Sequence, residues 1–473
     1  MQNLDEIVRT LRLCGQEHLL TFWDQLSRPQ KEHLMAQIRR LDTRNIPRWV
    51  QETVKNQSPL AVPEEFDPAP SYPPTPQTPK QEKKYAQARK LGEDLLRQGK
   101  GAGFVVAGGQ GTRLGFDGPK GDYPISPIQK KTPFQLFAET IAAARRKYGA
   151  MLPWLIMTSP LNHRQTVEIF EAADYFGLGA DTVTLFQQGV LPNFDLDGRI
   201  FLADKDTLAQ SPDGHGGSLK ALHTSGALAR MKQCGVEYIS YWQVDNPLVR
   251  LFDPLFIGLH ALDEAGMSSK ALIKAHPTEK VGNFCLVDGR VAVIEYSDLD
   301  EDQAYRKNPD GSLVFELGSI AIHILSVWFV EKLNASGDFA LPLHRAVKKI
   351  PHIDLSGNHI QPDKPNGVKL ETFVFDALPM SEKSVILQTI RSEEFAPVKN
   401  AVGDDSAEVT VRMMIERAAN WLRSAGVQAP RRSDGRADCR LEIAPSFALS
   451  AEDIGPKAGQ IAPIKPGDAV YLE

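Results

Sequence analysis

The feature that most constrains the fold is an alternation between residues 101 and 244 of short, mainly apolar segments with longer, amphipathic segments. The short segments are GFVVAGG (103–109), PWLIMTS (153–159), TVTLFQQ (182–188) and EYISYWQV (237–244). Strands that are apolar on both faces and separated by helices form mostly parallel sheets covered by helices on both sides. The alternation therefore predicts an α/β, doubly wound, Rossmann-like domain.

The later part of the chain is richer in strand patterns. NFCLVDG and VAVIEYSDL are joined by Asp288-Gly289, a dipeptide typical of two-residue hairpin turns, and we expect these strands to make the sheet a mixed one. Helices are predicted again around 340–350 and 378–392. Within the alternating region, Asn162 is predicted to cap the helix that follows the second strand.

Composition changes along the chain predict four segments. Apolar residues at helical spacing before residue 60 indicate a helical subdomain, and seven prolines in AVPEEFDPAPSYPPTPQTPK indicate an extended strap. Short strand fragments broken by Pro and Gly follow a last helix at about 406–425. The expected segments are a helical N-terminal subdomain (1–60), the strap with a connecting helix (61–100), an α/β catalytic domain (101–425) and a small C-terminal β lobe (426–473).

The charge balance excludes several classes of partner. With 54 Lys and Arg against 59 Asp and Glu, the net charge is −5, and no basic cluster is present to attract nucleic acid or an anionic membrane. The N-terminus lacks a basic stretch followed by an apolar run, and no 18 consecutive apolar residues occur. We expect a cytoplasmic protein without a nucleic-acid or membrane partner. The sequence does not indicate an oligomeric state.

A glycine-rich loop follows the first predicted strand, in VVAGGQGTRLGFDGPKG (105–121). Glycines allow successive backbone amides to face one concavity and allow a phosphate to approach the main chain. Ligands of open α/β sheets bind at the carboxyl ends of the strands, where this loop lies. Arg113 and Lys120 add two cations beside it, which would neutralise a polyphosphate during phosphoryl transfer.

Two common phosphate-binding motifs do not match this loop. Walker A requires Ser or Thr after its lysine, but Gly121 follows Lys120. The dinucleotide fingerprint requires glycine three positions after Gly111, but Leu114 stands there and Gly115 comes one position late. The spacing therefore disfavours an ordinary P-loop and an NAD-binding loop.

The loop and several later motifs together resemble a known family. AGGQGTRLGFDGPKGDYPI (107–125) resembles the signature of the nucleotide-sugar pyrophosphorylases, and further motifs in the same order narrow the resemblance to the UDP-sugar pyrophosphorylases, in particular the eukaryotic-type UDP-N-acetylglucosamine group. These further motifs include FQQGVLP (186–192), SPDGHGGSLKAL (211–222), QVDNPLVRLFDPLFIG (243–258), HPTEKVGNFCLVDG (276–289), KPNGVKLETFVFD (364–376) and FAPVKNA (395–401).

The resemblance implies a nucleotidyltransferase fold of the GT-A-like kind and a uridylyltransferase activity. Such an enzyme joins UTP and a sugar 1-phosphate to form a UDP-sugar and pyrophosphate, by attack of the sugar phosphate on the α-phosphorus. It implies that Arg113, Lys120 and Lys399 are catalytic cations. It further implies nucleotide contacts from a set of residues in four motifs, namely Val106, Ala107, Gly108, Gly109, Gln188, Gly214, His215 and Lys369. The N-acetylglucosamine enzymes carry Asn at the position of His215, whereas enzymes of the UDP-glucose type often carry His.

The resemblance also implies a metal ligand and a sugar pocket. Asp245, which follows a buried strand, is the expected ligand of Mg²⁺, a hard cation that prefers oxygen donors. Gly282 and Glu295 are the expected contacts of the sugar hydroxyl groups. Ser319 stands where relatives have a sugar-contacting Asn, so glucose 1-phosphate and galactose 1-phosphate stay open beside the expected N-acetylglucosamine 1-phosphate.

Two other functions remain open at the level of sequence. A UDP-sugar-binding regulatory protein would keep the uracil contacts without the cations or the metal ligand, but Arg113, Lys120, Asp245 and Lys399 are all present. A glycosyltransferase would carry an Asp-x-Asp motif after a strand. The single spelling that follows a predicted strand is Asp298-Leu299-Asp300, in an acidic run typical of a solvated turn.

Overall fold

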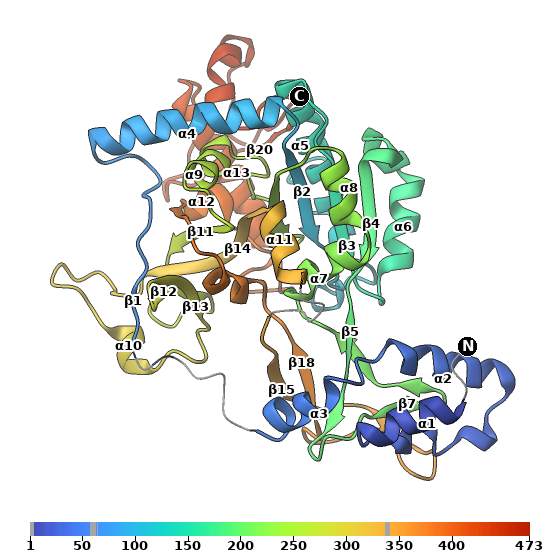
Figure 1. Cartoon of the computed structure of the whole chain (residues 1–473). Helices are drawn as coiled ribbons and strands as arrows, with labels where there is room; N and C mark the ends of the chain where they lie inside the picture. Colours follow the sequence, from blue (N-terminus) through green and yellow to red (C-terminus); the bar gives the residue numbers. More distant parts are fainter. Residues whose placement is uncertain (1–3, 57–62, 64, 336–340) are drawn as a thin grey trace. The chain divides into compact units, whose positions relative to one another are not determined.

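The computed structural model describes residues 4–56, 63, 65–335 and 341–473. The chain forms two compact units (Figure 1). The first unit combines Met1–Pro63, Gln188–Lys220 and Ala340–Asp376, and the second combines Glu64–Gln187, Ala221–Phe339 and Ala377–Glu473. Both units are therefore assembled from stretches that lie far apart in the sequence. The four continuous segments expected from the sequence stay a prediction.

A ten-stranded mixed sheet forms the second unit, with the strand order β1-β12-β14-β10-β2-β3-β4 and with β11, β13 and β19 paired beside this path. The parallel strands β10, β2, β3 and β4 are those of the alternating region, as predicted. Their bounds are Tyr238–Gln243, Gly101–Val106, Trp154–Thr158 and Val183–Gln187. The remaining bounds are Asp67–Pro68 (β1), Met267–Ile273 (β11), Gly282–Val287 (β12), Arg290–Ile294 (β13), Leu317–Ser326 (β14) and Ile386–Gln388 (β19).

Antiparallel strands complete this sheet on one side. β14 pairs antiparallel with β10, β11 and β12, and β12 with β13 forms the predicted hairpin, in which Val287 opposes Arg290. Asp288 and Gly289 both have positive φ, 49° and 73°, as a type I′ turn requires. The doubly wound α/β class and the mixed sheet are thus confirmed.

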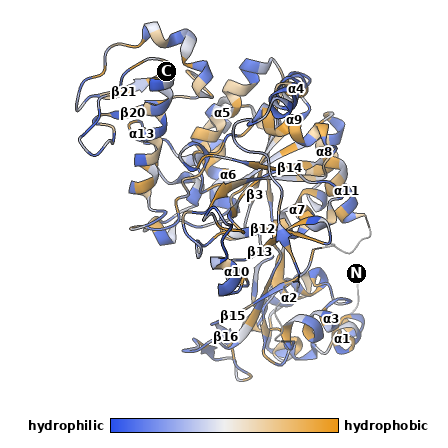
Figure 2. Ribbon diagram, turned by 90° about the vertical axis from the view of Figure 1, so that its left-hand side faces the viewer, coloured by the Kyte–Doolittle hydropathy of each residue, from blue (hydrophilic) through white to orange (hydrophobic). Residues whose placement is uncertain are grey.

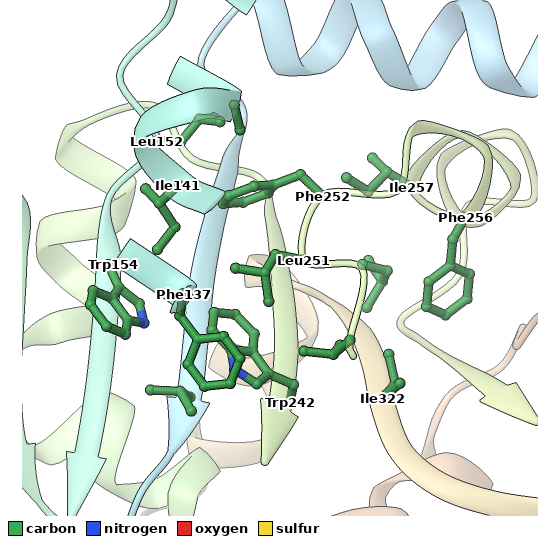
Figure 3. Close-up of a cluster of buried hydrophobic side chains, with 14 of the residues drawn as sticks. Phe137, Ile141, Leu152, Trp154, Trp242, Leu251, Phe252, Phe256, Ile257 and Ile322 are labelled. Carbon is green, nitrogen blue, oxygen red and sulfur yellow. The ribbon is translucent and has the colours of Figure 1, made fainter. Parts of the chain in front are cut away.

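The second unit also contains helices, some of which pack on the sheet and others on one another or on the C-terminal strands. They are α4 (Pro79–Arg97), α5 (Pro133–Tyr148), α6 (His163–Ala172), α8 (Ala227–Gln233), α9 (Pro254–Leu262), α10 (Glu301–Tyr305), α11 (Val327–Asn334), α12 (Arg391–Glu394) and α13 (Ala407–Ser424). Aromatic and branched side chains from α5, β3, β10 and α9 fill the space between them (Figure 3). Phe137 and Trp242 lie at the centre of this core, with ring centroids 5.4 Å apart.

Two glycines allow α4 and α9 to touch backbone to backbone. A Cβ at Gly92 would lie 1.9 Å from Pro254 O, and one at Gly258 would lie 1.7 Å from Ala88 O. Each helix therefore fits into a notch in the other. Figure 2 shows α9 in hydrophobic colours, in keeping with a helix in which Pro254–His260 is buried, whereas α4 carries many hydrophilic residues.

The first unit contains the helical N-terminal segment and several short sheets. The helices are α1 (Leu4–Leu13), α2 (Arg28–Arg40) and α3 (Ile46–Trp49). The strands are β5 (Val190–Pro192), β6 (Phe194–Asp195), β7 (Leu202–Asp204), β8 (Thr207–Leu208), β9 (Gln210–Pro212), β15 (His344–Lys348), β16 (His352–Ile353), β17 (His359–Ile360) and β18 (Gly367–Glu371). Apolar residues of the helices and strands form one core. The helix α7 (Gly217–Thr224) continues from this unit into the second.

The helices predicted around 340–350 and 378–392 are wrong. His344–Lys348 is strand β15, which pairs with β18, and Ile386–Gln388 is strand β19, which pairs with β11. Among the described residues in and next to these two ranges, helical structure is limited to a 3₁₀ segment at Val374–Met380 and the short helix α12. Pairing with strands distant in the sequence overrides the local helical pattern at these positions.

The strap and the C-terminal lobe are joined to the second unit by pairing and packing. Tyr72 N donates to Ile386 O, and Gln388 N to Tyr72 O, so the proline-rich segment runs extended along β19, as predicted. At the other end, β20 (Arg440–Ile443) and β21 (Ala469–Leu472) form a parallel pair that packs on the second half of α13. Among the residues that the structure describes, no helix is long and apolar enough to cross a membrane.

Candidate functional site

The glycine-rich loop begins where β2 ends, and its carbonyl groups are held by α6. Asn162 Nδ2 donates to Ala107 O at 2.8 Å and to Gly109 O at 3.3 Å. Ser159 Oγ donates to Gly108 O at 2.8 Å. Three successive carbonyl groups are thus occupied by two side chains from the segment that follows β3.

The amides of the same loop are left open. Within the described part of the chain, no acceptor pairs with the amides of Gly108, Gly109 and Gln110. Successive free amides form a concavity that suits an anion. Asn162 occupies the N-cap position of α6, as predicted, but its side chain makes no cap hydrogen bond and holds the loop instead. The Asn162 amide donates to carbonyl groups of a loop about 50 residues earlier in the chain. The sequence around Asn162 gives no sign of these partners.

The far side of the loop folds back on itself and brings Lys120 beside the glycines. Gly111 N donates to Gly118 O at 2.8 Å, and Lys120 N donates to Gly109 O at 3.1 Å. Arg113 lies on the exposed turn between these two bonds and pairs with no acid among the described residues. Both predicted cations therefore lie on the loop that carries the free amides.

Lys120 and Asp245 face one another at the carboxyl edge of the sheet. Lys120 Nζ lies 3.9 Å from Asp245 Oδ2, and the two side chains are 15% and 13% exposed. Asp245 follows β10, whose neighbour in the sheet is β2, and Val244 N donates to Val106 O at 3.1 Å. The structure thus brings the predicted metal ligand and one predicted catalytic cation together.

The segment that carries Lys399 is bound along Asp245 and its neighbour. Val398 N donates to Asp245 O at 2.8 Å. Asn246 Nδ2 donates to Glu394 O at 2.7 Å, and Asn246 Oδ1 accepts from Ala396 N at 3.1 Å. The main chain at Lys399 therefore lies close to Asp245.

The Lys399 side chain has an acid partner of its own. Lys399 Nζ lies 3.5 Å from Asp405 Oδ2, and both side chains are partly exposed. This pair is weak because water screens it. A phosphate group would compete with Asp405 for the ammonium.

A buried charge cluster lies behind this segment. Lys270 is 1% exposed, and its Nζ lies 2.7 Å from Asp253 Oδ2 and 2.5 Å from Glu394 Oε1. Burial alone would raise the pKa of Asp253, but Lys270 and Arg250 together lower it well below its usual value. The cluster joins β11 to α12 and to the N-terminus of α9, where Asp253 caps Leu255 N.

An apolar cluster supports the three segments that carry cations. Its members include Leu114 beside Arg113, Tyr123 and Ile125 after Lys120, Val398 beside Lys399, and Leu136, Ala407, Val411 and Met414 from α5 and α13. One helix, α13, thus packs under all three segments.

Asp245 fits a magnesium ion of the kind that is bound mainly by substrate oxygens. In the described residues, no group of three or more His, Cys, Asp or Glu side chains is arranged to hold a metal ion. Mg²⁺ commonly takes one or two carboxylates, keeps several waters and binds substrate phosphates. The single carboxylate offers the ion an oxygen donor, and the free amides and the lysine beside it suit the substrate phosphates that would supply further oxygens.

The three predicted sugar contacts lie together on the antiparallel side of the sheet. Gly282 in β12 opposes Ser319 in β14. A Cβ at Gly282 would lie 3.7 Å from Glu295 Oε1. Gly282 is buried and its missing side chain leaves room for Val293 Cγ1, which lies 2.5 Å from the place of a Cβ.

The remaining predicted nucleotide contacts lie in the first unit. Gln188 directly follows β4, and its Nε2 donates to Asp213 Oδ1 at 3.2 Å. Gly214 has φ 82°, and a Cβ there would lie 2.4 Å from Thr372 O. Lys369 lies in β18, half-buried, and pairs with no acid within the described ranges.

His215 belongs to the same segment and is held by the residues after Thr372. Val374 N donates to His215 Nδ1 at 3.1 Å, and the ring stacks on Phe373 at 5.2 Å between centroids. Burial, and to a smaller extent His344, lowers the pKa of His215 to about 4. The ring is therefore neutral near pH 7, accepts at Nδ1 and carries its proton on Nε2.

Sequence reasoning missed the polar residues that hold these groups. Asn162 was assigned to a helix cap, and Asn246, Glu394 and Asp213 were given no role. A usable signal existed for Asn246, which follows Asp245 at the carboxyl edge of the sheet, where ligand-facing and loop-holding residues gather. Glu394 and Asp213 carry no such signal, because their partners come from distant segments.

Comparisons with known proteins agree with this geometry. The sequence profile of the family described as UTP–glucose-1-phosphate uridylyltransferase matches residues 73–429. UDP-N-acetylhexosamine pyrophosphorylase-like protein 1 of Xenopus tropicalis is 34% identical over 470 residues, covering 95% of this chain and 89% of that protein. UDP-N-acetylglucosamine pyrophosphorylase of Saccharomyces cerevisiae is 32% identical, with 95% and 96% covered.

Solved structures share the fold. The uridine diphosphate N-acetylglucosamine pyrophosphorylase of Trypanosoma brucei, in complex with an inhibitor, superposes with a TM-score of 0.85 at 26% identity and covers 100% of this chain and 98% of that one. A UDP-glucose pyrophosphorylase of Leishmania major superposes with a TM-score of 0.62 at 15% identity, with 91% and 87% covered, which is a likeness of fold alone.

Proposed function

This chain belongs to the UTP–glucose-1-phosphate uridylyltransferase family, and from that premise we propose that it joins UTP and N-acetylglucosamine 1-phosphate into UDP-N-acetylglucosamine and pyrophosphate. It is a nucleotidyltransferase with UDP-sugar pyrophosphorylase activity and the corresponding fold. The observation that carries the proposal is the approach of Lys120 to Asp245 beside three free loop amides.

The triphosphate would bind at the glycine-rich loop. We assign Val106, Ala107, Gly108 and Gly109 to the nucleoside and α-phosphate side, where the open amides support contact with phosphate oxygens. Arg113 would grip the departing pyrophosphate. Its exposed guanidinium offers planar, paired donors for two phosphate oxygens.

Lys120 and Lys399 would act on the charge that builds up during the reaction. Lys120 lies beside the loop, and the main chain of Lys399 lies along Asp245, so both are within the same part of the second unit. Asp245 would hold Mg²⁺. When bound, the ion supplies positive charge to the phosphate oxygens.

The reaction needs no covalent protein intermediate. A phosphate oxygen of the sugar 1-phosphate forms a bond to the α-phosphorus of UTP, while the bond from that phosphorus to the bridging oxygen of pyrophosphate breaks. The leaving pyrophosphate keeps the electron pair. The work of the protein is to position the two substrates and to neutralise charge, for which fixed amides and cations are suited.

We assign the uracil contact to Gln188, Gly214 and His215, and a further phosphate contact to Lys369. Support for the first three comes from polar groups that the fold leaves available, among them the Nε2 proton of the neutral His215 ring. Lys369 lacks an acid partner in the part of the chain that the structure describes, so its charge is available to a phosphate.

The acceptor sugar has one serious alternative. Relatives named for N-acetylglucosamine or N-acetylhexosamine support the N-acetylated substrate. Ser319 and His215 instead favour glucose 1-phosphate or galactose 1-phosphate, because a serine offers one hydroxyl where relatives have a two-sided amide. Gly282 and Glu295 would contact sugar hydroxyl groups shared by all these acceptors.

The experiment that decides is a direct assay of pyrophosphate release. Purified protein is mixed with UTP, Mg²⁺ and one of N-acetylglucosamine, glucose or galactose 1-phosphate. We expect release that is fastest with the N-acetylated sugar. Faster release with glucose 1-phosphate would establish the alternative, and no release with any of the three would refute the proposal.

The other functions considered from the sequence gain no support. A purely regulatory UDP-sugar-binding protein would be expected to lack the cations or the metal-binding carboxylate. This chain retains Arg113, Lys120 and Lys399 as well as Asp245. In the Asp298-Leu299-Asp300 run, Asp300 Oδ1 accepts from Gln303 N at 2.8 Å and caps α10, and Asp298 is exposed.

The cytoplasmic localisation expected from the sequence stays a prediction.

A further inference from the structure

In the first unit, the side-chain amide nitrogen of Gln188 has hydrogen-bond partners, and its amide oxygen has none among the described residues. Its Nε2 donates to Asp213 Oδ1 at 3.2 Å and approaches Gly214 O at 3.5 Å. Among the residues that the structure describes, no donor pairs with Gln188 Oε1, although the residue is only 7% exposed. The oxygen is not among the fully buried side-chain atoms that lack a partner, so it is open to a ligand that can donate a hydrogen bond to it.

The direction of this amide is fixed by chemistry. Both groups that Nε2 faces are acceptors: a carboxylate, which when ionised can only accept, and a backbone carbonyl. Turning the amide over would set Gln188 Oε1 against the Asp213 carboxylate and leave the carboxylate unsatisfied. The acceptor end of Gln188 therefore faces away from Asp213.

Asp213 occupies a space made for its carboxylate. A Cβ at Gly217 would lie 2.1 Å from Asp213 Oδ1, and one at Gly189 would lie 2.4 Å from Asp213 Oδ2. The backbone is held as well, since Thr372 N and Thr372 Oγ1 each donate to Asp213 O at 2.8 Å. A buried acid placed between two glycines and held by Thr372 has a fixed position.

We propose that Asp213 is a positioning residue that determines which nucleotide this enzyme accepts, by holding the Gln188 amide with its oxygen toward the base. The inference rests on the proposed function, in which Gln188 contacts the uracil. Asp213 itself does not touch the nucleotide; it acts through Gln188.

The base chemistry gives this arrangement its selectivity. Uracil carries a donor at N3–H, which the Gln188 oxygen can accept. Cytosine has an unprotonated acceptor at N3, so the same oxygen would face another acceptor. In the described part of the first unit the amide of Gly214 also has no acceptor, which leaves a donor for a carbonyl oxygen of the base. An acceptor and a donor together match the imide edge of uracil.

The test compares UTP with CTP in Asp213→Asn. Asparagine keeps the shape but both donates and accepts, so it no longer dictates the direction of Gln188. We expect the ratio of kcat/KM for UTP to that for CTP to fall about tenfold, the size of one misplaced hydrogen bond. Asp204→Asn, an exposed acid in the same unit, is the matched control and should keep the ratio. A folded, active Asp213→Asn protein with the wild-type ratio would overturn the proposal.

A second measurement uses the unchanged protein. Burial raises the pKa of Asp213 to about 6, against the opposing effects of the Gln188 bond and the charge of Lys220 on α7. Once protonated, Asp213 can donate to Gln188 Oε1 and allow the amide to turn over. The UTP to CTP ratio should therefore fall between pH 7.5 and 5.5, and a constant ratio would contradict the inference even if the variant does not fold.

Other titratable groups near Asp213 do not imitate this effect. His215 follows it in the chain and is already neutral over this range, since its pKa is about 4. Glu371 lies near Gly214, and its charge would act on both nucleotides alike.

The results that would refute this inference differ from those that would refute the proposed function. Wild-type protein that releases no pyrophosphate with UTP refutes the function, whereas active protein with an unchanged variant ratio refutes only the role of Asp213.

Discussion

At the scale of single residues, Lys120 and Asp245 contribute charge that matters most in the transition state. Removing either side chain leaves the glycine-rich loop and the sheet intact, because neither side chain belongs to the apolar core. We expect Lys120→Ala or Asp245→Ala to lower kcat about 10²- to 10³-fold. Steady-state kinetics with each substrate, alongside thermal unfolding, measures this. Lys130→Ala, at an exposed position, is the control, and undiminished turnover in both site variants would contradict the assigned roles.

The buried carboxyl of Asp213 also affects stability. Because burial raises its pKa from 3.8 to about 6 in the folded protein, the folded state binds more protons than the unfolded state between these values. The wild type therefore loses stability as pH rises through this window, by on the order of 2–3 kcal/mol.

Asp213→Asn removes that dependence, so it should gain stability relative to the wild type between pH 4 and pH 7. Urea unfolding at both pH values measures the difference. Asp204→Asn should show no such trend. A gap between wild type and Asp213→Asn that does not change with pH would show that the carboxyl ionises normally.

Ser319 is the residue at which the sugar preference can be shifted. Its hydroxyl is shorter than the amide of the relatives and lies opposite Gly282. Ser319→Asn should raise the preference for N-acetylglucosamine 1-phosphate over glucose 1-phosphate about threefold to tenfold, by adding one hydrogen bond. The ratio of kcat/KM for the two sugars measures it, with Ser356→Asn as an exposed control. An unaltered ratio would place the acetyl group elsewhere.

Single residues show where the sequence was informative. Lys120 and Asp245 were each placed by sequence after a strand of the same sheet, and the structure brings their side chains to 3.9 Å, while their roles stay a prediction. Asn162 and Asp213 were not predicted, since their hydrogen-bond partners lie in other segments. The direction of a side-chain amide such as that of Gln188 depends on its neighbours in space, which a residue type alone does not specify.

At the scale of elements, the glycine-rich loop depends on α6 for its shape. Asn162 connects the loop carbonyls to Ser159 N. Asn162→Ala leaves the carbonyl of buried Ala107 without its donor, whereas Gly109 O keeps Lys120 N. We expect a loss of about 1–3 kcal/mol in unfolding free energy and a raised KM for UTP. Chemical denaturation and initial-rate kinetics measure these. Glu171→Ala, at an exposed position near the end of α6, is the control. A normal KM would mean that the loop keeps its shape without this anchor.

Elements of the alternating region were predicted because each is determined by its own apolar pattern. β3, β4 and β10 lie within the predicted segments, and β2 begins two residues before its segment, at Gly101. The helices expected around 340–350 and 378–392 were not found, because β15 and β19 form through partners in β18 and β11. Their local pattern fits either structure, and the partner decides.

At the scale of the whole molecule, one buried charge cluster links distant segments of the second unit. Lys270→Met would remove the ammonium that Asp253 and Glu394 both contact, and the buried carboxylates would keep only the more distant Arg250. We expect a loss of about 3–5 kcal/mol in unfolding free energy, measured by denaturant titration. The matched control is Lys383→Met, which breaks the exposed pair with Glu264 and should cost below about 1 kcal/mol. Equal losses in both variants would show that burial does not matter here.

The composition of the two units could not be read along the sequence. The first unit takes in three stretches, two of which interrupt the predicted catalytic domain. Periodicity reports which face of a segment is apolar, and it does not report which distant segment covers that face. The strap shows the same limit, for its prolines indicated an extended chain and gave no sign that Tyr72 would pair with β19.

The reciprocal notches between α4 and α9 restrict how this protein can diverge. Gly92 lies against Pro254 O, and Gly258 lies against Ala88 O. Neither position can accept even a methyl group unless the facing helix moves away. A substitution at one glycine cannot be compensated by a change at the other, because a side chain at each position would collide with a different carbonyl group. Among relatives of this chain, substitutions at these two glycines should therefore be rarer than at the surrounding apolar residues. A change of size at an apolar residue can be compensated by an opposite change in a neighbouring side chain.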